Sequence, residues 1–194
     1  MKNQKIRKIK EFGDFQTPSN LSLQITGLLR NRGINPSTII EPNCGTGSFI
    51  FSSLDIFPNA DIIGMDINRD YIDMINKKLD QSERNNKVNL KQADFFQINW
   101  KKQIDSLQKP ILIIGNPPWI TSAEMTILKG QNLPIKTNIH KFSGLDAKTG
   151  KSNFDIAEWI IITLLVSFNG YDGLLAMLCI NSVARKVLTY CNNN

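Results

Sequence analysis

Short apolar runs alternate with amphipathic segments along most of this chain. The apolar runs predict strands at Thr38–Glu41, Ile62–Ile67, Val88–Ala93, Ile111–Gly115 and Leu174–Ile180. Apolar residues at helical spacing predict helices at about Ser19–Arg30, from Ser48 onward, at Arg69–Ser82 and at Phe154–Phe168. Strands and helices in alternation predict an α/β fold, a doubly wound and mostly parallel sheet.

Two segments depart from this alternation. Residues 1–11 are rich in lysine and predict a basic N-terminal arm, which leaves residues 12–194 as one domain. Residues 129–152 are polar and too long for a passive connection in a compact domain. The lysines of this second segment suit contacts with phosphates, and they suit a solvated loop equally well.

Composition narrows the class of protein. The 194 residues are 41% hydrophobic and 21% charged, as in a globular protein, and the longest apolar run, Trp159–Val166, is too short to cross a bilayer. The three cysteines are few and widely spaced, which favours a reducing cytoplasm over a disulfide framework. Because the sequence has a single histidine, His140, and no cluster of residues at metal-ligand spacing, we expect no metal site. A net charge of +6 favours a polyanionic binding partner, but from charge alone a nucleic-acid partner is about as probable as none.

A glycine-rich turn follows the first predicted strand. The segment Glu41–Phe49 reads EPNCGTGSF, and its glycines would let the backbone approach a ligand closely. Ile50 stands where a dinucleotide fingerprint has a third glycine, and no Lys-Ser or Lys-Thr follows to make a phosphate-binding P-loop. A ligand loop and a structural turn both fit this pattern.

Carboxylates follow the next two predicted strands. Asp66 lies about 20 residues beyond the glycines, where an acidic side chain can accept hydrogen bonds from a ribose. A helix cap is the alternative for this residue. Asp94 precedes Phe95, a pair that could hold an adenine by a hydrogen bond and by ring packing, although a purely structural role is as compatible.

The fourth predicted strand runs directly into Gly-Asn-Pro-Pro-Trp at residues 115–119. Consecutive prolines fix two φ angles and remove two backbone donors, and they push Asn116 into an extended conformation. This predicts a stiff loop that presents one amide side chain, bare carbonyls and an indole at the ligand-binding edge of the sheet.

Together these blocks resemble the DNA adenine-N6 methyltransferases of the gamma motif order. The blocks that carry the resemblance are Phe12–Pro18, Glu41–Phe49, Asn116–Trp119, Lys151–Asp155 and Gly173–Leu178. They occur in that order and cover about residues 12–190. The resemblance implies the fold of methyltransferases that use S-adenosylmethionine, acting on DNA in a restriction-modification system.

The resemblance also implies roles for particular residues. The catalytic loop would be Asn116, Pro117, Pro118 and Trp119, with the Asn116 oxygen and the Pro117 carbonyl accepting the amine hydrogens and Trp119 stacking on the flipped base. The cofactor would be held by Thr17, Glu41, Asn43, Gly45, Gly47, Asp66, Ile67, Asp94 and Phe95. Asn153 and Phe154 would line the target-base pocket, or else simply begin a helix that Ser152 or Asn153 caps, with Asp155 in its first turn.

Families of this type usually continue with more strands and a target-recognition domain. The sequence ends about ten residues after its fifth predicted strand, so we expect the catalytic domain to lack its last strands and a recognition domain. The expected partners are DNA and either a separate recognition subunit or a downstream polypeptide. We expect no association with a membrane. A protein-glutamine N5 methyltransferase and a non-catalytic fragment that binds cofactor or DNA remain alternatives.

Overall fold

The computed structural model describes residues 15–81, 87–119 and 155–193. The predicted basic arm, the long polar segment, Asn153 and Phe154 lie outside these ranges. The chain forms two compact units. The first, called the sheet unit, comprises Gln16–Pro117 and Leu164–Leu178, and the second unit comprises the remaining residues.

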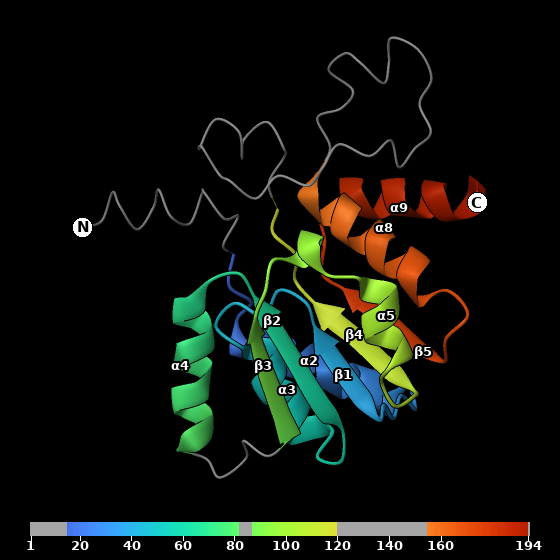
Figure 1. Cartoon of the computed structure of the whole chain (residues 1–194). Coiled ribbons are helices and arrows are strands. Elements are labelled where there is room, and N and C mark those ends of the chain that lie inside the picture. The colour runs from blue at the N-terminus through green and yellow to red at the C-terminus, as the bar shows by residue number, and fades with distance from the viewer. Residues whose placement is uncertain (1–14, 82–86, 120–154, 194) are drawn as a thin grey trace. The chain divides into compact units, whose positions relative to one another are not determined.

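The sheet unit is built on five parallel strands in the order β3-β2-β1-β4-β5 (Figure 1). The strands are β1 (Thr38–Glu41), β2 (Asp61–Asp66), β3 (Val88–Gln92), β4 (Ile111–Gly115) and β5 (Gly173–Met177). From β1 the order runs to β2 and β3 on one side and to β4 and β5 on the other. The strand order therefore reverses between β1 and β4, which is where ligands bind in open parallel sheets. The predicted α/β class is confirmed.

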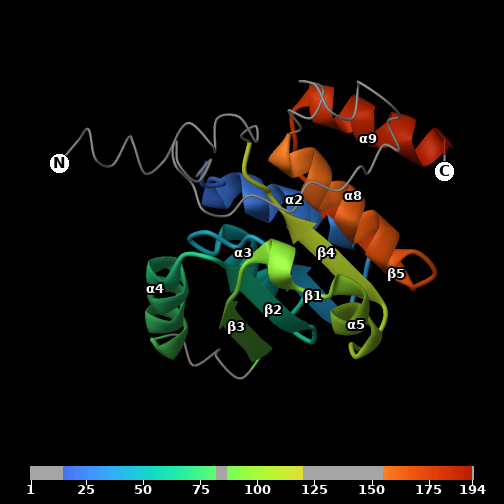
Figure 2. The same cartoon turned by 45° about the horizontal axis from the view of Figure 1, so that its top comes forward.

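Helices cover both faces of this sheet. Those of the sheet unit are α2 (Ser19–Asn31), α3 (Ser48–Ile56), α4 (Arg69–Asp80), the 3-10 helix η2 (Phe95–Gln97) and α5 (Trp100–Asp105). Two further helices, α8 (Ile156–Phe168) and α9 (Asn181–Asn193), belong mostly or wholly to the second unit. Side chains of α2, α3 and α4 join one apolar cluster with alternate residues of the strands. Figure 2 shows α5 on the opposite face of the sheet from α2 and α3.

The two central strands explain why the sheet is covered on both sides. All residues of β1 and β4 are buried, and Ile40 and Ile113 are completely inaccessible to solvent. Strands that are apolar on both faces must be packed on both faces. Burying one such side chain stabilises the fold by roughly 1.5–3 kcal/mol.

Several elements differ from those that the sequence pattern predicts. Two helices, α5 and α9, were not predicted, β5 ends at Met177 rather than Ile180, and α4 ends at Asp80. The short α5 begins where the Asn99 side chain accepts a hydrogen bond from the Lys102 amide. No helix among the described residues is long and apolar enough to cross a membrane.

The second unit contains an ion pair between two helices. Lys186 of α9 lies 3.0 Å from the Glu158 carboxylate near the start of α8, and the Glu158 side chain is only 5% exposed. Asp155 accepts a hydrogen bond from the Ala157 amide at 2.9 Å. The described start of α8 is therefore capped by Asp155, which the sequence had instead suggested for the first turn.

Candidate active site

Polar side chains gather where the strands of the sheet unit end. Glu41 ends β1, Asp66 ends β2 and Asn116 directly follows β4. Because the strands are parallel, these ends lie at one edge of the sheet, with β1 between β2 and β4. Thr17 joins this edge from the segment that precedes α2.

The glycine-rich turn after β1 has a backbone that only glycine adopts readily. Gly45 and Gly47 have φ angles of +50° and +85°. A Cβ atom on Gly47 would lie 2.9 Å from a carbon of the Ile75 side chain, and one on Gly45 would lie 2.6 Å from Gln16 Oε1. Both glycines are favoured by their φ angles, and a side chain at either position would also displace a neighbouring side chain, Ile75 of α4 or Gln16.

Asp66 holds this turn against the start of α4. One carboxylate oxygen accepts a hydrogen bond from the Gly45 amide, and the other accepts one from the Asn68 amide, each at 2.8 Å. The predicted contact between Asp66 and a ribose stays a prediction, and the observed role of Asp66 is to fix the turn.

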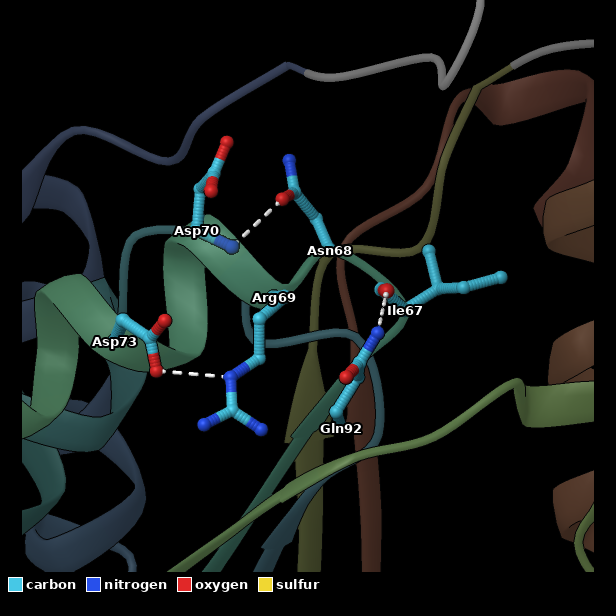
Figure 3. A network of polar contacts seen from close by, with 6 residues as sticks. All are labelled: Ile67, Asn68, Arg69, Asp70, Asp73 and Gln92. Carbon is cyan, nitrogen blue, oxygen red and sulfur yellow. Dashed lines mark hydrogen bonds and ion pairs between the residues drawn. The ribbon is translucent and has the colours of Figure 1, made fainter.

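Ile67 is fixed by the strand beside it. The Gln92 side chain, at the end of β3, donates a hydrogen bond to the Ile67 carbonyl at 3.2 Å (Figure 3). The Asn68 side chain accepts a hydrogen bond from the Asp70 amide at 3.0 Å, which makes Asn68 the N-cap of α4. The backbone at this end of β2 is therefore set before any ligand binds.

Asp94 and Phe95 have clear structural functions. Asp94 caps η2 by accepting a hydrogen bond from the Phe96 amide at 3.0 Å. Phe95 is 4% exposed, and its ring centre lies 4.8 Å from that of Trp100. Their predicted contact with adenine is untested, and Phe95 could offer a ligand only a small part of its ring.

Glu41 is a carboxyl group buried at the end of the central strand, with 3% of its surface exposed. Burial raises the pKa of Glu41 well above its ordinary value, the Ile50 amide opposes this by hydrogen bonding, and the charge of Asp66 adds to the rise. Among the described residues, Glu41 Oε2 and Asn43 Oδ1 are buried oxygens without a hydrogen-bond partner. Buried acceptors in this condition favour a ligand that brings donors or positive charge.

Cys44 lies inside the same turn and does not act as a nucleophile there. The residue is 4% exposed, and burial raises the pKa of its thiol, with Glu41 and Asp66 adding to the effect. A thiol that stays protonated is unreactive. Cys44 is therefore a packing residue of the turn.

The amide side chain of Asn116 is held by Thr17. Asn116 Nδ2 donates a hydrogen bond to Thr17 Oγ1 at 3.2 Å, although 99 positions separate the two residues in sequence. Thr17 is 9% exposed, and its carbonyl accepts a hydrogen bond from the Ser48 hydroxyl at 2.6 Å. Pro117, the next residue, is buried. The loop that carries Asn116 is therefore held by the Asn116–Thr17 hydrogen bond and by the packing of Pro117.

The last two residues of the Asn-Pro-Pro-Trp motif belong to the second unit. Pro118 is half-buried there, whereas Trp119 is 36% exposed. Phe15 is 58% exposed and lies against Trp119, with ring centres 5.9 Å apart. These two rings offer aromatic surface to solvent. The predicted roles of the four motif residues stay predictions.

Gln16 is a site residue that sequence reasoning missed. Its side-chain oxygen accepts hydrogen bonds from both the amide and the hydroxyl of Thr46, each at 2.8 Å. The two residues are 30 positions apart. No local pattern signals such a contact, and only the position of Gln16 beside Thr17 could have drawn attention to it.

Comparisons with known proteins identify relatives along nearly the whole chain. A sequence model of the family described as N-6 DNA Methylase matches residues 1–183. The type II methyltransferase M.NspV of Nostoc sp. is 46% identical over 185 residues, which are 94% of this chain and 38% of that protein. The modification methylase CviBIII of Paramecium bursaria Chlorella virus NC1A is 32% identical over 117 residues, which are 60% of this chain and 28% of that protein. The chain thus spans well under half the length of these relatives.

The fold is shared with solved structures of low sequence identity. A candidate RNA methyltransferase of Pyrococcus horikoshii superposes with a TM-score of 0.56 at 15% identity, covering 92% of this chain and 70% of that one. This likeness concerns the fold alone.

Proposed function

This chain belongs to the N-6 DNA Methylase family, and from that premise we propose that it transfers a methyl group to the N6 amine of adenine in DNA. S-adenosylmethionine is the methyl donor that goes with this family and fold. We place the reaction in a restriction-modification system, in keeping with the names of the type II and modification methylases that resemble the chain.

The observation that carries the proposal is the pair of buried oxygens beside the glycine turn. Glu41 Oε2 and Asn43 Oδ1 lack a donor among the described residues. S-adenosylmethionine has an ammonium group, a positively charged sulfur and hydroxyl groups, so it can supply both donors and charge. The residues that would hold it are Thr17, Glu41, Asn43, Gly45, Gly47, Asp66, Ile67, Asp94 and Phe95. When bound, this cofactor supplies a methyl group activated by the sulfonium.

The protein's part in the reaction is to prepare the adenine amine. The lone pair of that amine is delocalised into the purine, which makes it a poor nucleophile. The Asn116 side-chain oxygen and the Pro117 carbonyl accept hydrogen bonds from its two N–H groups, and this concentrates electron density on the nitrogen. The nitrogen releases one of these protons to solvent once it has taken the methyl group. The stiff loop holds both acceptors in advance, so rate enhancement comes from positioning and preorganised electrostatics.

The target base must leave the duplex before these groups can reach it. An adenine amine inside a DNA helix is inaccessible to such a site, so the base is flipped out. Trp119 stacks on the extruded ring, for which its exposed surface is suited. Asn153 and Phe154 contribute to the same pocket. We propose that the choice of a DNA sequence needs further polypeptide, either a recognition subunit or a downstream part of the protein.

The test measures transfer of labelled methyl groups from S-adenosylmethionine to unmethylated plasmid DNA. Asn116→Ala should lower the rate about a hundredfold or more, because removing one preorganised hydrogen-bonding group from an active site costs about 10²–10³ in rate. Asn76→Ala is the matched control, since Asn76 is an exposed residue of α4. Digestion of the DNA should yield N6-methyladenine. Label that appears only in protein would overturn the proposal, and so would full activity of the Asn116 variant.

A further inference from the structure

The hydrogen bond between Thr17 and Asn116 decides which end of the Asn116 amide is turned toward Thr17. An asparagine side chain carries its NH₂ and its oxygen on opposite sides of one carbon. Because Nδ2 is bound to Thr17 Oγ1 at 3.2 Å, the oxygen is directed to the other side. The opposite orientation would use the acceptor oxygen to contact Thr17.

The position of Thr17 is itself fixed by the glycine turn and α3. The Ser48 hydroxyl, at the first position of α3, donates to the Thr17 carbonyl at 2.6 Å. The Ser22 hydroxyl in turn donates to the Ser48 carbonyl at 3.0 Å. Gln16, the preceding residue, accepts two hydrogen bonds from Thr46. The Thr17 backbone, from which the hydroxyl extends, is therefore held in place.

We propose that Thr17 is a positioning residue that acts through Asn116. Its hydroxyl accepts one hydrogen of the Asn116 amide and so keeps Oδ1 available for the amine of the substrate. This inference rests on the proposed function, because it assigns Oδ1 the task of accepting an amine hydrogen. It also replaces the cofactor-binding role that the sequence resemblance gave to Thr17 and that the proposed function carried over.

The two readings of Thr17 predict different losses on substitution. A residue that holds the cofactor loses cofactor affinity when its hydroxyl is removed. A residue that orients Asn116 loses kcat, while cofactor affinity stays within about twofold of the original. The size of the kcat loss should be about 10- to 100-fold, as expected when a buried amide N–H loses its acceptor.

The experiment compares Thr17→Val, which removes the hydroxyl at constant shape, with Thr17→Ser, which keeps it. Thr26→Val is the matched control, since Thr26 is a buried threonine of α2 whose hydroxyl bonds only to backbone carbonyls of its own helix. Cofactor affinity is measured by calorimetry, kcat and KM by methyl transfer to DNA, and folding by thermal unfolding. We expect Thr17→Val to lose kcat alone, and Thr17→Ser and Thr26→Val to retain it.

A spectroscopic measurement separates failure of this inference from failure of the proposed function. In a nitrogen-15 correlation spectrum, the side-chain NH₂ signals of Asn116 should shift in Thr17→Val, remain near their original positions in Thr17→Ser and be unchanged in Thr26→Val. If the wild-type chain transfers no methyl group to DNA even when the further polypeptide that recognition needs is added, the proposed function fails, and the spectra still decide the contact. Unshifted Asn116 signals, an unchanged kcat, or a loss of cofactor affinity that matches the loss of kcat would each overturn the inference.

Discussion

Glu41 places an ionisable group at the buried end of the central strand, β1. Its pKa is raised well above the ordinary value of 4.5 because burial disfavours the charged form. Above pH 4.5 the unfolded chain loses this proton while the folded chain retains it, so the unfolded state binds fewer protons. The contribution of Glu41 to the free energy of unfolding therefore falls as the pH rises from 4.5 through its folded pKa.

Glu41→Gln removes this pH dependence without changing the size of the side chain. We expect the variant to gain stability over the wild-type chain as the pH is raised from 5 to 8, as followed by thermal unfolding without cofactor. Affinity for S-adenosylmethionine should fall at least about tenfold, since a charge-assisted hydrogen bond is worth about 1.5–3 kcal/mol. Equal pH dependence of both proteins would show that Glu41 ionises normally.

The glycine turn acts as one element with the helices that contact it. Gly47 adopts a φ of +85°, and a methyl group there would collide with the Ile75 side chain of α4. Gly47→Ala should lower the free energy of unfolding by about 1–3 kcal/mol, the usual range for a strained backbone position. It should also weaken cofactor binding, because the turn must shift to relieve the contact.

Gly27→Ala is the control for this substitution. Gly27 lies within α2, and nothing lies within 4 Å of a Cβ placed on it. Alanine should stabilise this helix by about 0.5–1 kcal/mol. Chemical denaturation of both variants would give opposite changes in stability. A destabilised Gly27→Ala would mean that the difference does not come from backbone conformation.

The sequence predicted elements best where burial produced a regular pattern. β1 and β4 were predicted to the residue because every side chain in them is buried. α9 was missed because only two of its positions, Val183 and Val187, are buried, and a single four-residue spacing is too short to reveal a helix. The positions of the motifs at the strand ends were also predictable, because parallel strands all end at the same edge. The contacts of Gln16 and Thr17 were not, since they join residues far apart in sequence.

At the scale of the whole molecule, the reactivity of the cysteines reports on unfolding. Its three cysteines are free and differ in exposure, Cys191 being exposed, Cys179 intermediate and Cys44 buried. We expect a thiol reagent to label Cys191 first and Cys179 more slowly, because burial raises the pKa of the Cys179 thiol. Cys44 should react only when the sheet unit unfolds.

Adding S-adenosylmethionine should then slow the labelling of Cys44 selectively. A ligand that binds only the folded chain lowers the unfolded population by the factor 1 + [L]/Kd. At a concentration of about 100 times Kd, labelling of Cys44 should slow by about a hundredfold, with Cys191 unaffected. The rates can be followed by mass spectrometry of peptides. Fast labelling of Cys44 in the folded protein would contradict its assignment as a packing residue.

The strand order also has a consequence for how the protein is made. β1 pairs with β4, which leaves the ribosome long after β1 does. At a synthesis rate of about 5–20 residues per second, one edge of β1 stays unpaired for several seconds. Its isoleucines are the kind of residue that recruits another chain to an open strand edge. Nascent chains of this protein are therefore expected to aggregate through β1 unless they are kept apart until Gly115 has left the ribosome.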